Sequence, residues 1–216
     1  PLHAPQFAQV DRDYLMDAID STFVSSVGAY VDQFEAQLKQ ITKAPAVVAT
    51  MNGTAGLHAV LHLAGVGAGD YVITQPLSFI ATCNAIAYTG ASPIFVDIDR
   101  DRYSMCPEAL GGWLTDNAEL DSDGQCRNKA DGRPIKACVP VHILGHPARM
   151  SDIASVCADW NLNLIEDAAE ALGTYDQGRH AGLTGRYGVL SFNGNKIVTT
   201  GGGGAILCSE EDGKRA

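Results

Sequence analysis

Short apolar runs alternate with helical patterns along most of this sequence. The predicted strands cover residues 46–50, 71–74, 93–97, 138–141, 162–167, 187–192 and 205–208. Helical patterns lie between several of them, at residues 57–64, 79–88 and 153–160. Parallel neighbouring strands need a crossover connection, which is usually a helix. The alternation therefore predicts an α/β fold with a mainly parallel central sheet and helices on both faces.

Two further helices are predicted before this alternation, at residues 10–19 and 31–41. Residues 23–30 lie between them and mix apolar with small side chains, which is typical of a surface loop or of a segment covered by a partner. Residues 116–134 are poor in apolar residues and rich in turn formers, so we expect an exposed insertion. With 216 residues, 46% of them hydrophobic, the chain can bury one sizeable core, and we expect one large domain.

The charge and the cysteines narrow the function classes. A net charge of −10 argues against a nucleic-acid or anionic-membrane partner. The sequence shows neither an apolar run long enough for a membrane span nor the pattern of a signal peptide, so we expect a soluble, cytoplasmic protein. The cysteines show neither C-x-x-C nor paired histidine spacing, and we expect free thiols in a reducing compartment and no metal site.

Lys196 stands in the segment S-F-N-G-N-K-I-V-T-T-G-G-G-G, residues 191–204. Four consecutive glycines carry a large entropy cost on folding, so this backbone has a reason to lack side chains. One interpretation is that the Lys196 amine forms a Schiff base and the glycines let the backbone pass close to a flat cofactor. Such an amine attacks a carbonyl only in its neutral form, which partial burial favours. The alternative is a solvated lysine in a flexible loop.

Two motifs follow predicted strands, where ligands of parallel sheets bind. The segment N-G-T-A, residues 52–55, opens a helix whose N-terminal N–H groups would hold a phosphate, although an ordinary helix entry has the same pattern. It matches neither a Walker motif nor the dinucleotide fingerprint. Phe79, in P-L-S-F, would either stack on a flat ligand or join the core.

Asp167 and Glu170 belong to the segment E-D-A-A-E-A-L-G. Asp167 ends an apolar strand, where an unpaired carboxylate is costly, so a cationic partner is expected. A pyridinium nitrogen would serve, and so would an arginine, with three candidates in the chain: Arg149, Arg179 and Arg186. Glu170 follows three residues later, a spacing that keeps it beside Asp167 if a helical turn begins there.

Seven motifs occur in one order along the chain: F-V-S-S-V-G-A-Y-V, N-G-T-A, P-L-S-F-I-A-T, F-V-D-I-D, V-H-I-L-G, E-D-A-A-E-A-L-G and S-F-N-G-N-K. In this order, with the lysine last, the sequence resembles the sugar aminotransferases of the DegT/DnrJ/EryC1/StrS family, which are pyridoxal-phosphate enzymes of fold type I. Members of the family continue into a smaller C-terminal domain. The resemblance thus implies that residues 1–216 form the pyridoxal-phosphate-binding large domain with an N-terminal helical segment, without the small domain.

The resemblance also implies roles for individual residues. Lys196 would be the Schiff-base lysine and the acid and base of proton transfer. Asp167 would pair with the pyridine nitrogen and keep it protonated, which makes the ring an electron sink. Glu170 stands where many members carry glutamine near the ring hydroxyl. The implied cofactor-binding set is Gly53, Thr54, Ala55, Phe79, Asp167, Glu170, Ser191, Asn193 and Lys196, with the phosphate on Thr54, Ala55 and Ser191 and the ring against Phe79.

The lysine at position 196 favours transamination, because the dehydratase branch of this fold carries histidine there. The resemblance is greatest to members that aminate UDP-4-keto-6-deoxy-N-acetylhexosamines in bacterial surface-glycan pathways, with glutamate as the expected amino donor and a homodimer as the expected assembly. Two other functions stay open: a non-catalytic domain that binds a nucleotide sugar or phosphate, and a sugar dehydratase. A nicotinamide oxidoreductase is supported by fold alone, without the glycine fingerprint.

Overall fold

The computed structural model describes residues 4–23 and 25–216 of the chain. Seven strands form the central sheet in the order β1-β11-β10-β7-β6-β2-β3. Their bounds are Ala46–Thr50 (β1), Tyr71–Thr74 (β2), Ser92–Phe95 (β3), Ile135–Val139 (β6), Asn163–Asp167 (β7), Tyr187–Ser191 (β10) and Gly204–Cys208 (β11). The strands β10, β7, β6, β2 and β3 are parallel, and β11 runs antiparallel to both of its neighbours. The predicted mainly parallel sheet is confirmed.

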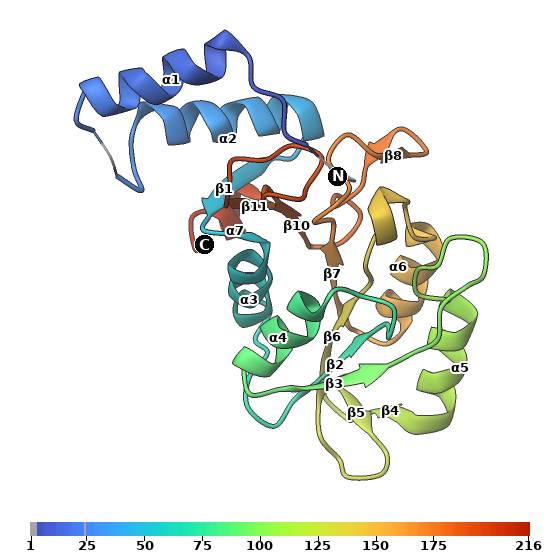
Figure 1. Ribbon diagram of the computed structural model, residues 1–216. Coiled ribbons are helices and arrows are strands. Elements are labelled where there is room, and N and C mark those ends of the chain that lie inside the picture. The colour runs from blue at the N-terminus through green and yellow to red at the C-terminus, as the bar shows by residue number, and fades with distance from the viewer. Residues whose placement is uncertain (1–3, 24) are drawn as a thin grey trace.

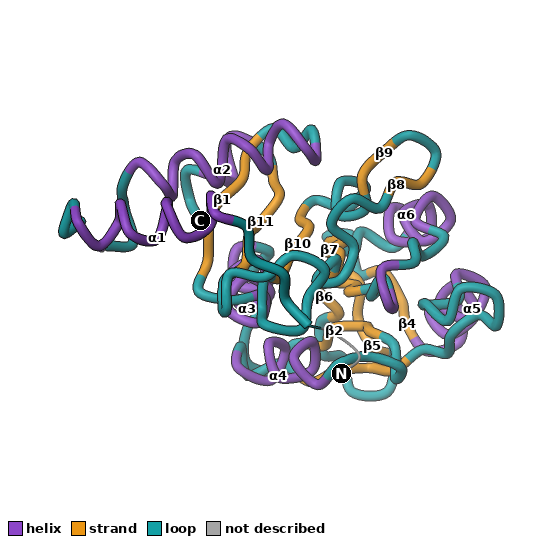
Figure 2. Tube along the Cα trace, turned by 45° about the horizontal axis from the view of Figure 1, so that its top comes forward, coloured by secondary structure: helices purple, strands orange, loops and turns teal. Residues whose placement is uncertain are grey.

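Helices cover both faces of this sheet (Figures 1 and 2). The helices are Gln9–Asp20 (α1), Ala29–Thr42 (α2), Gly53–Leu63 (α3), Ile80–Tyr88 (α4), Pro107–Asn117 (α5), Met150–Asp159 (α6) and Glu210–Gly213 (α7), with a short 3₁₀ turn η1 at Ile143–Gly145. One core cluster joins α3 and α4 to the sheet, and a second joins α5 and α6 to its other face. A third cluster lies between α2, β10 and β11.

Helices α1 and α2 lie side by side at one end of the molecule, with α2 packed against the sheet and α1 outside it (Figure 1). Tyr14 of α1 stacks edge-on against Tyr30 of α2, with ring centroids 5.5 Å apart. The hydroxyl of Tyr30 also donates a hydrogen bond of 2.5 Å to Asp17. Nevertheless α1 has no buried residue, so its apolar side chains face solvent in the described part of the chain.

Residues 23–30, predicted as a surface loop or as a segment covered by a partner, are helical at their C-terminal end. Val24 lies outside the described residues, so the expectation for residues 23–30 is examined on the remaining positions. The helix α2 begins at Ala29, which makes Tyr30 helical rather than part of a loop. Phe23 and Val27 are exposed, so neither joins the core of its own chain.

The insertion at residues 116–134 is not wholly exposed. It forms an antiparallel hairpin from β4 (Ala118–Leu120) and β5 (Cys126–Asn128). Ala118 and Cys126 are buried in the second core cluster, which explains why these two apolar residues interrupt a polar segment. A second hairpin, β8 (Tyr175–Asp176) and β9 (Arg179–His180), and the helix α5 have no counterpart among the predicted elements.

All six cysteines are free thiols, and four of them are buried, as expected: Cys126, Cys138, Cys157 and Cys208. No cluster of metal-ligating side chains occurs in residues 4–23 and 25–216. None of the helices within those residues is both long and apolar enough to cross a membrane.

Candidate functional site

The predicted site residues meet beyond the carboxyl ends of β1, β7 and β10, next to the turn that follows β2. Lys196 Nζ lies 3.1 Å from Glu170 Oε1 and 5.9 Å from the centroid of the Phe79 ring. At the end of β10, Gly53 packs directly against Ser191. Residues more than 100 positions apart in the sequence therefore form one cluster.

The N-terminus of α3 offers a place for an anion. The side chain of Asn52 caps the helix by accepting a hydrogen bond of 2.8 Å from the Ala55 N–H. A Cβ atom on Gly53 would lie 2.9 Å from Ser191 Cβ, so only glycine allows the helix to start this close to β10. The first N–H groups of a helix lack partners within the helix and carry the positive end of its dipole. With the Ser191 hydroxyl beside them, they suit a phosphate.

Lys196 lies in the turn between β10 and β11, and its backbone N–H donates to Asn193 O. Its side chain is only 10% exposed, so the interpretation as a solvated lysine is wrong. Glu170 bridges this amine to a second segment, because its other carboxylate oxygen accepts a hydrogen bond of 3.0 Å from the Leu144 N–H. The lysine is thus held in a defined place. Asn193, by contrast, is exposed, and its side chain contacts Asn195.

Asp167 is a buried carboxylate, 4% exposed, that forms no salt bridge with any residue the structure describes. It accepts hydrogen bonds from the Thr82 hydroxyl at 2.6 Å and from the Ala169 N–H at 3.2 Å. Burial raises the pKa of Asp167 above its ordinary value, and the bond from Thr82 opposes that rise. An anion buried here without a cation leaves a favourable position for a cationic ligand atom.

The arginine explanation for Asp167 is therefore wrong. Arg149 pairs with Asp99, Glu108 and Asp152. Arg186 pairs with Asp212 through two nitrogens. Arg179 is an exposed residue of β9 and forms no salt bridge with Asp167.

Phe79 is 70% exposed at the start of α4, so it does not join the core. The turn that presents it is anchored by Gln75, a fully buried side chain at the end of β2. Gln75 donates to Leu77 O and accepts from the N–H groups of Met105 and Val141. An aromatic ring held at the surface next to a lysine is available to a flat ligand.

Sequence reasoning missed three residues that support this cluster: Gln75, Ser78 and Thr82. Thr82 carried one usable signal, since it stands one helical turn after Phe79 and therefore faces the same side of α4. Gln75 had no comparable sequence signal, because its contacts join segments that lie far apart in the chain. The contacts of Ser78 depend on the geometry of its turn.

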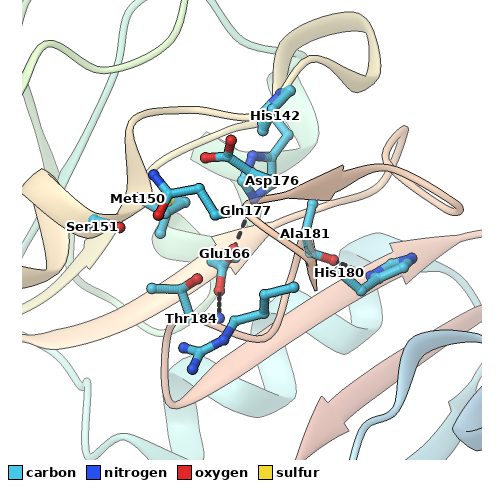
Figure 3. A pocket seen from close by; sticks show the side chains of 11 residues that line it. His142, Met150, Ser151, Glu166, Asp176, Gln177, His180, Ala181 and Thr184 are labelled. Atoms are coloured by element: carbon cyan, nitrogen blue, oxygen red, sulfur yellow. Dashed lines mark hydrogen bonds and ion pairs between the residues drawn. The ribbon is translucent and has the colours of Figure 1, made fainter.

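A separate cavity of about 220 Å³ lies between α6 and the β8–β9 hairpin (Figure 3). None of the nine predicted site residues lines it. Its deepest members, His142 and Glu166, bond each other at 2.9 Å, and Glu166 also accepts from the N–H groups of Gly182, Thr184 and Gly185. Burial acts to raise the pKa of Glu166, but these bonds outweigh it and leave that pKa lowered. Glu166 is thus satisfied by structural contacts.

Known proteins are similar to this chain along almost its whole length. The model of the DegT/DnrJ/EryC1/StrS aminotransferase family matches residues 5–215. The chain is 37% identical over 210 residues to EpsN of Bacillus subtilis (strain 168), whose provisional name is that of a pyridoxal phosphate-dependent aminotransferase; the match covers 97% of this chain and 51% of EpsN. It is 35% identical to the GDP-perosamine synthase of Escherichia coli O157:H7, over 98% of this chain and 53% of that protein. The chain thus spans about half the length of these curated relatives.

Solved structures share the fold. The 3-amino-5-hydroxybenzoic acid synthase superposes with a TM-score of 0.84 at 29% identity, covering 99% of this chain and 51% of that one. The structure of DesI determined in the presence of its TDP-sugar product gives a TM-score of 0.81 at 30% identity, covering 96% of this chain and 48% of that one. The fold class expected from the alternation of strands and helices is confirmed at the level of the whole chain.

Proposed function

The chain belongs to the DegT/DnrJ/EryC1/StrS aminotransferase family, and we propose that it is the large, pyridoxal-phosphate-binding domain of an aminotransferase acting on a nucleotide-linked keto sugar. The single observation that carries the proposal is the pairing of Lys196 with Glu170 next to Asp167. A mostly buried primary amine and a buried carboxylate that forms no salt bridge within the described residues occur together at one edge of the sheet. Neither a phosphate-binding domain nor an oxidoreductase has a use for this combination.

The residues fit the cofactor part by part. The N-terminus of α3, with Gly53, Thr54 and Ala55, and the hydroxyl of Ser191 suit its phosphate. The exposed ring of Phe79 suits stacking on a pyridine ring. Pyridoxal phosphate supplies an aldehyde for the lysine and a ring that accepts electrons when its nitrogen is protonated. Asn193 and Glu170 complete the proposed binding set.

Lys196 and Asp167 take the catalytic roles in this proposal. With pyridoxal phosphate bound, Lys196 would hold its aldehyde and would carry a proton between the reacting carbons of cofactor and substrate. The buried Asp167 carboxylate stabilises the positive charge on the ring nitrogen, since a charge pair is stronger where water is excluded. Glu170 holds the Lys196 amine through one carboxylate oxygen and bonds the Leu144 N–H through the other.

The names of the relatives support the substrate class. Two of the solved or curated relatives have names that refer to GDP-perosamine and to a TDP-sugar product. We propose a nucleoside diphosphate keto sugar as amino acceptor and glutamate as donor, in the synthesis of an amino sugar. The narrower expectation of a UDP-4-keto-6-deoxy-N-acetylhexosamine stays a prediction.

Borohydride trapping tests the proposal. Purified full-length protein is incubated with pyridoxal phosphate, reduced, digested and mapped by mass spectrometry. We expect the pyridoxyl group on Lys196, with Lys136→Ala as a control that keeps the adduct and Lys196→Ala as the variant that loses it. An adduct on another lysine would contradict the assignment. Protein that binds the cofactor without any lysine adduct would instead support a non-catalytic domain. If the adduct is on Lys196, a panel of nucleotide keto sugars assayed with glutamate identifies the amino acceptor.

A further inference from the structure

The hydroxyl of Thr82 is the one side-chain donor to Asp167 among the residues that the structure describes. Thr82 lies in α4, and its Oγ1 atom is 2.6 Å from Asp167 Oδ2 at the end of β7. Both side chains are buried. The other carboxylate oxygen, Oδ1, receives only the longer bond of 3.2 Å from the Ala169 N–H. One oxygen of Asp167 is therefore fixed by α4, and the other keeps capacity for a further donor.

Ser78 extends this contact by one hydroxyl. Its Oγ lies 2.9 Å from Thr82 Oγ1 and 3.0 Å from the Phe79 carbonyl oxygen. Thr82 has a single hydroxyl proton, which the carboxylate accepts, so the bond between the two hydroxyls needs the one proton of Ser78, and the Phe79 carbonyl oxygen is a second acceptor for that proton. The turn that presents Phe79 is thereby joined to Asp167 through two hydroxyl groups in series, which polarise each other.

We propose that Thr82, supported by Ser78, is a positioning residue that holds Asp167 as an oriented anion ready to bind a cationic ring nitrogen. This inference rests on the proposed function. Burial alone favours the protonated carboxyl, which could not hold a cation. The short bond from Thr82 is the leading contact that counteracts burial at Asp167. Because it occupies Oδ2, it also prevents the carboxylate from rotating freely.

The expected size of the effect follows from hydrogen bonds to charged groups. Removing the bond from Thr82 to the Asp167 carboxylate should weaken the binding of a cationic ring nitrogen by about 10- to 100-fold. The effect is confined to ligands that carry the ring nitrogen. A ligand with carbon in its place makes no ion pair with Asp167 and is indifferent to the state of that carboxylate.

The test compares the affinities of full-length protein for pyridoxal phosphate and for its 1-deaza analogue, in which a C–H group replaces the ring nitrogen. Wild-type protein should prefer pyridoxal phosphate. Thr82→Val, which keeps the β-branched shape, should weaken pyridoxal phosphate binding by about 10-fold or more and change binding of the analogue by less than about 2-fold. Thr82→Ser should restore the preference. Thr89→Val is the matched control, because Thr89 ends the same helix and bonds only local backbone groups.

Equal loss of both ligands in Thr82→Val would overturn the inference, since it would show a purely structural role. If Thr82→Val does not fold, Thr82→Ser and Ser78→Ala decide. Loss of the preference for pyridoxal phosphate over the analogue in Thr82→Ser overturns the inference. A reduction of that preference by about 3-fold in Ser78→Ala supports it. Wild-type protein that binds neither ligand contradicts the proposed function itself. Wild-type protein that prefers pyridoxal phosphate, with a preference unchanged in Thr82→Val, contradicts only the role of Thr82.

Discussion

Asp167 and Glu170 lie three residues apart but stand in different surroundings. Asp167 is buried between β7 and α4 and has hydrogen-bond donors without a cation. Glu170 is partly exposed and has a cation, the Lys196 ammonium, at 3.1 Å. The two carboxylates therefore have different tasks. Asp167 is placed to pair with a cationic ligand atom, and Glu170 positions the Lys196 side chain.

Replacing Asp167 by asparagine tests the first task. An amide accepts and donates hydrogen bonds but cannot hold a ring nitrogen in its cationic form, so we expect Asp167→Asn to keep the cofactor and to lose turnover by roughly 100-fold or more. Turnover with a keto-sugar substrate and the absorbance of bound cofactor give the two readings. Near-normal turnover would show that Asp167 has only a structural role.

The same substitution should stabilise the cofactor-free protein near neutral pH. Burial raises the pKa of Asp167 in the folded state, so ionising it opposes folding. Below the pKa of the unfolded chain, about 3.9, the group is protonated in both states and the cost is absent. As pH rises through the folded pKa, the cost appears. Thermal unfolding of Asp167→Asn should show a higher midpoint than wild type at pH 7 and no difference at about pH 3 or below, whereas Asp101→Asn, in an exposed turn, should match wild type at pH 7.

Glu170→Gln tests the second task. The carboxylate holds the Lys196 amine in an ion pair of 3.1 Å, and this contact has to break before the amine can bond an aldehyde. A partly exposed ion pair contributes about 0.2–1 kcal/mol, so the glutamine variant should load with pyridoxal phosphate about 1.5- to 5-fold faster at pH 7. Stopped-flow absorbance measures the rate, with Glu119→Gln on exposed β4 as the control. Slower loading in Glu170→Gln would instead mean that the carboxylate directs the lysine toward the cofactor.

At the scale of elements, the start of α3 depends on one glycine. A Cβ at position 53 would meet Ser191 Cβ at 2.9 Å, whereas a Cβ at Gly112, inside α5, would meet nothing within 4 Å. Gly53→Ala should push the helix away from β10, destabilise the protein by about 1–3 kcal/mol and weaken cofactor binding through the phosphate. Gly112→Ala should stabilise the protein by about 0.5–1 kcal/mol without changing binding. Urea unfolding and cofactor titration of both variants provide the measurement.

Elements were predictable from the sequence where one physical signal dominated. The strands β2, β7 and β10 lie inside the sheet and are largely buried, and they carry short apolar runs, as does the edge strand β1. The predicted bounds of all four nearly match the observed ones. The helix α5 was not predicted, because Gly111 and Gly112 weaken its helical pattern. The hairpins β4–β5 and β8–β9 were missed because strands of two or three residues carry too little periodicity.

The site was predictable only where residues follow strand ends. Lys196, Asp167 and the N-G-T-A turn have local signals, since each lies at an edge where parallel strands place ligands. Thr82 and Gln75 act through tertiary contacts: Thr82 bonds a residue 85 positions later, and Gln75 bonds one 66 positions later. No pattern within a short window encodes such a contact. The exposure of Phe79 was likewise decided by how Gln75 anchors its turn.

At the scale of the whole molecule, two groups of exposed apolar side chains bear on assembly. One is α1, which has no buried residue. The other surrounds the proposed site, where four apolar residues are more than half exposed: Met51, Phe79, Ile80 and Ile197. Single exposed apolar residues need no explanation, but groups of them around a site are typical of surfaces that another polypeptide covers.

We expect the full-length protein to be a homodimer with the cofactor pocket near the subunit boundary. The exposed apolar residues around Lys196 motivate this prediction, because a partner placed there would exclude water from the amine and from the Phe79 ring. A stable interface of this kind buries roughly 2,000 Å² or more in total, so dissociation at micromolar concentration should be negligible. Sedimentation velocity of the complete protein at about 1–10 µM measures the assembly directly. A monomer that binds pyridoxal phosphate and turns over would contradict the prediction, since its pocket would then be complete within one chain.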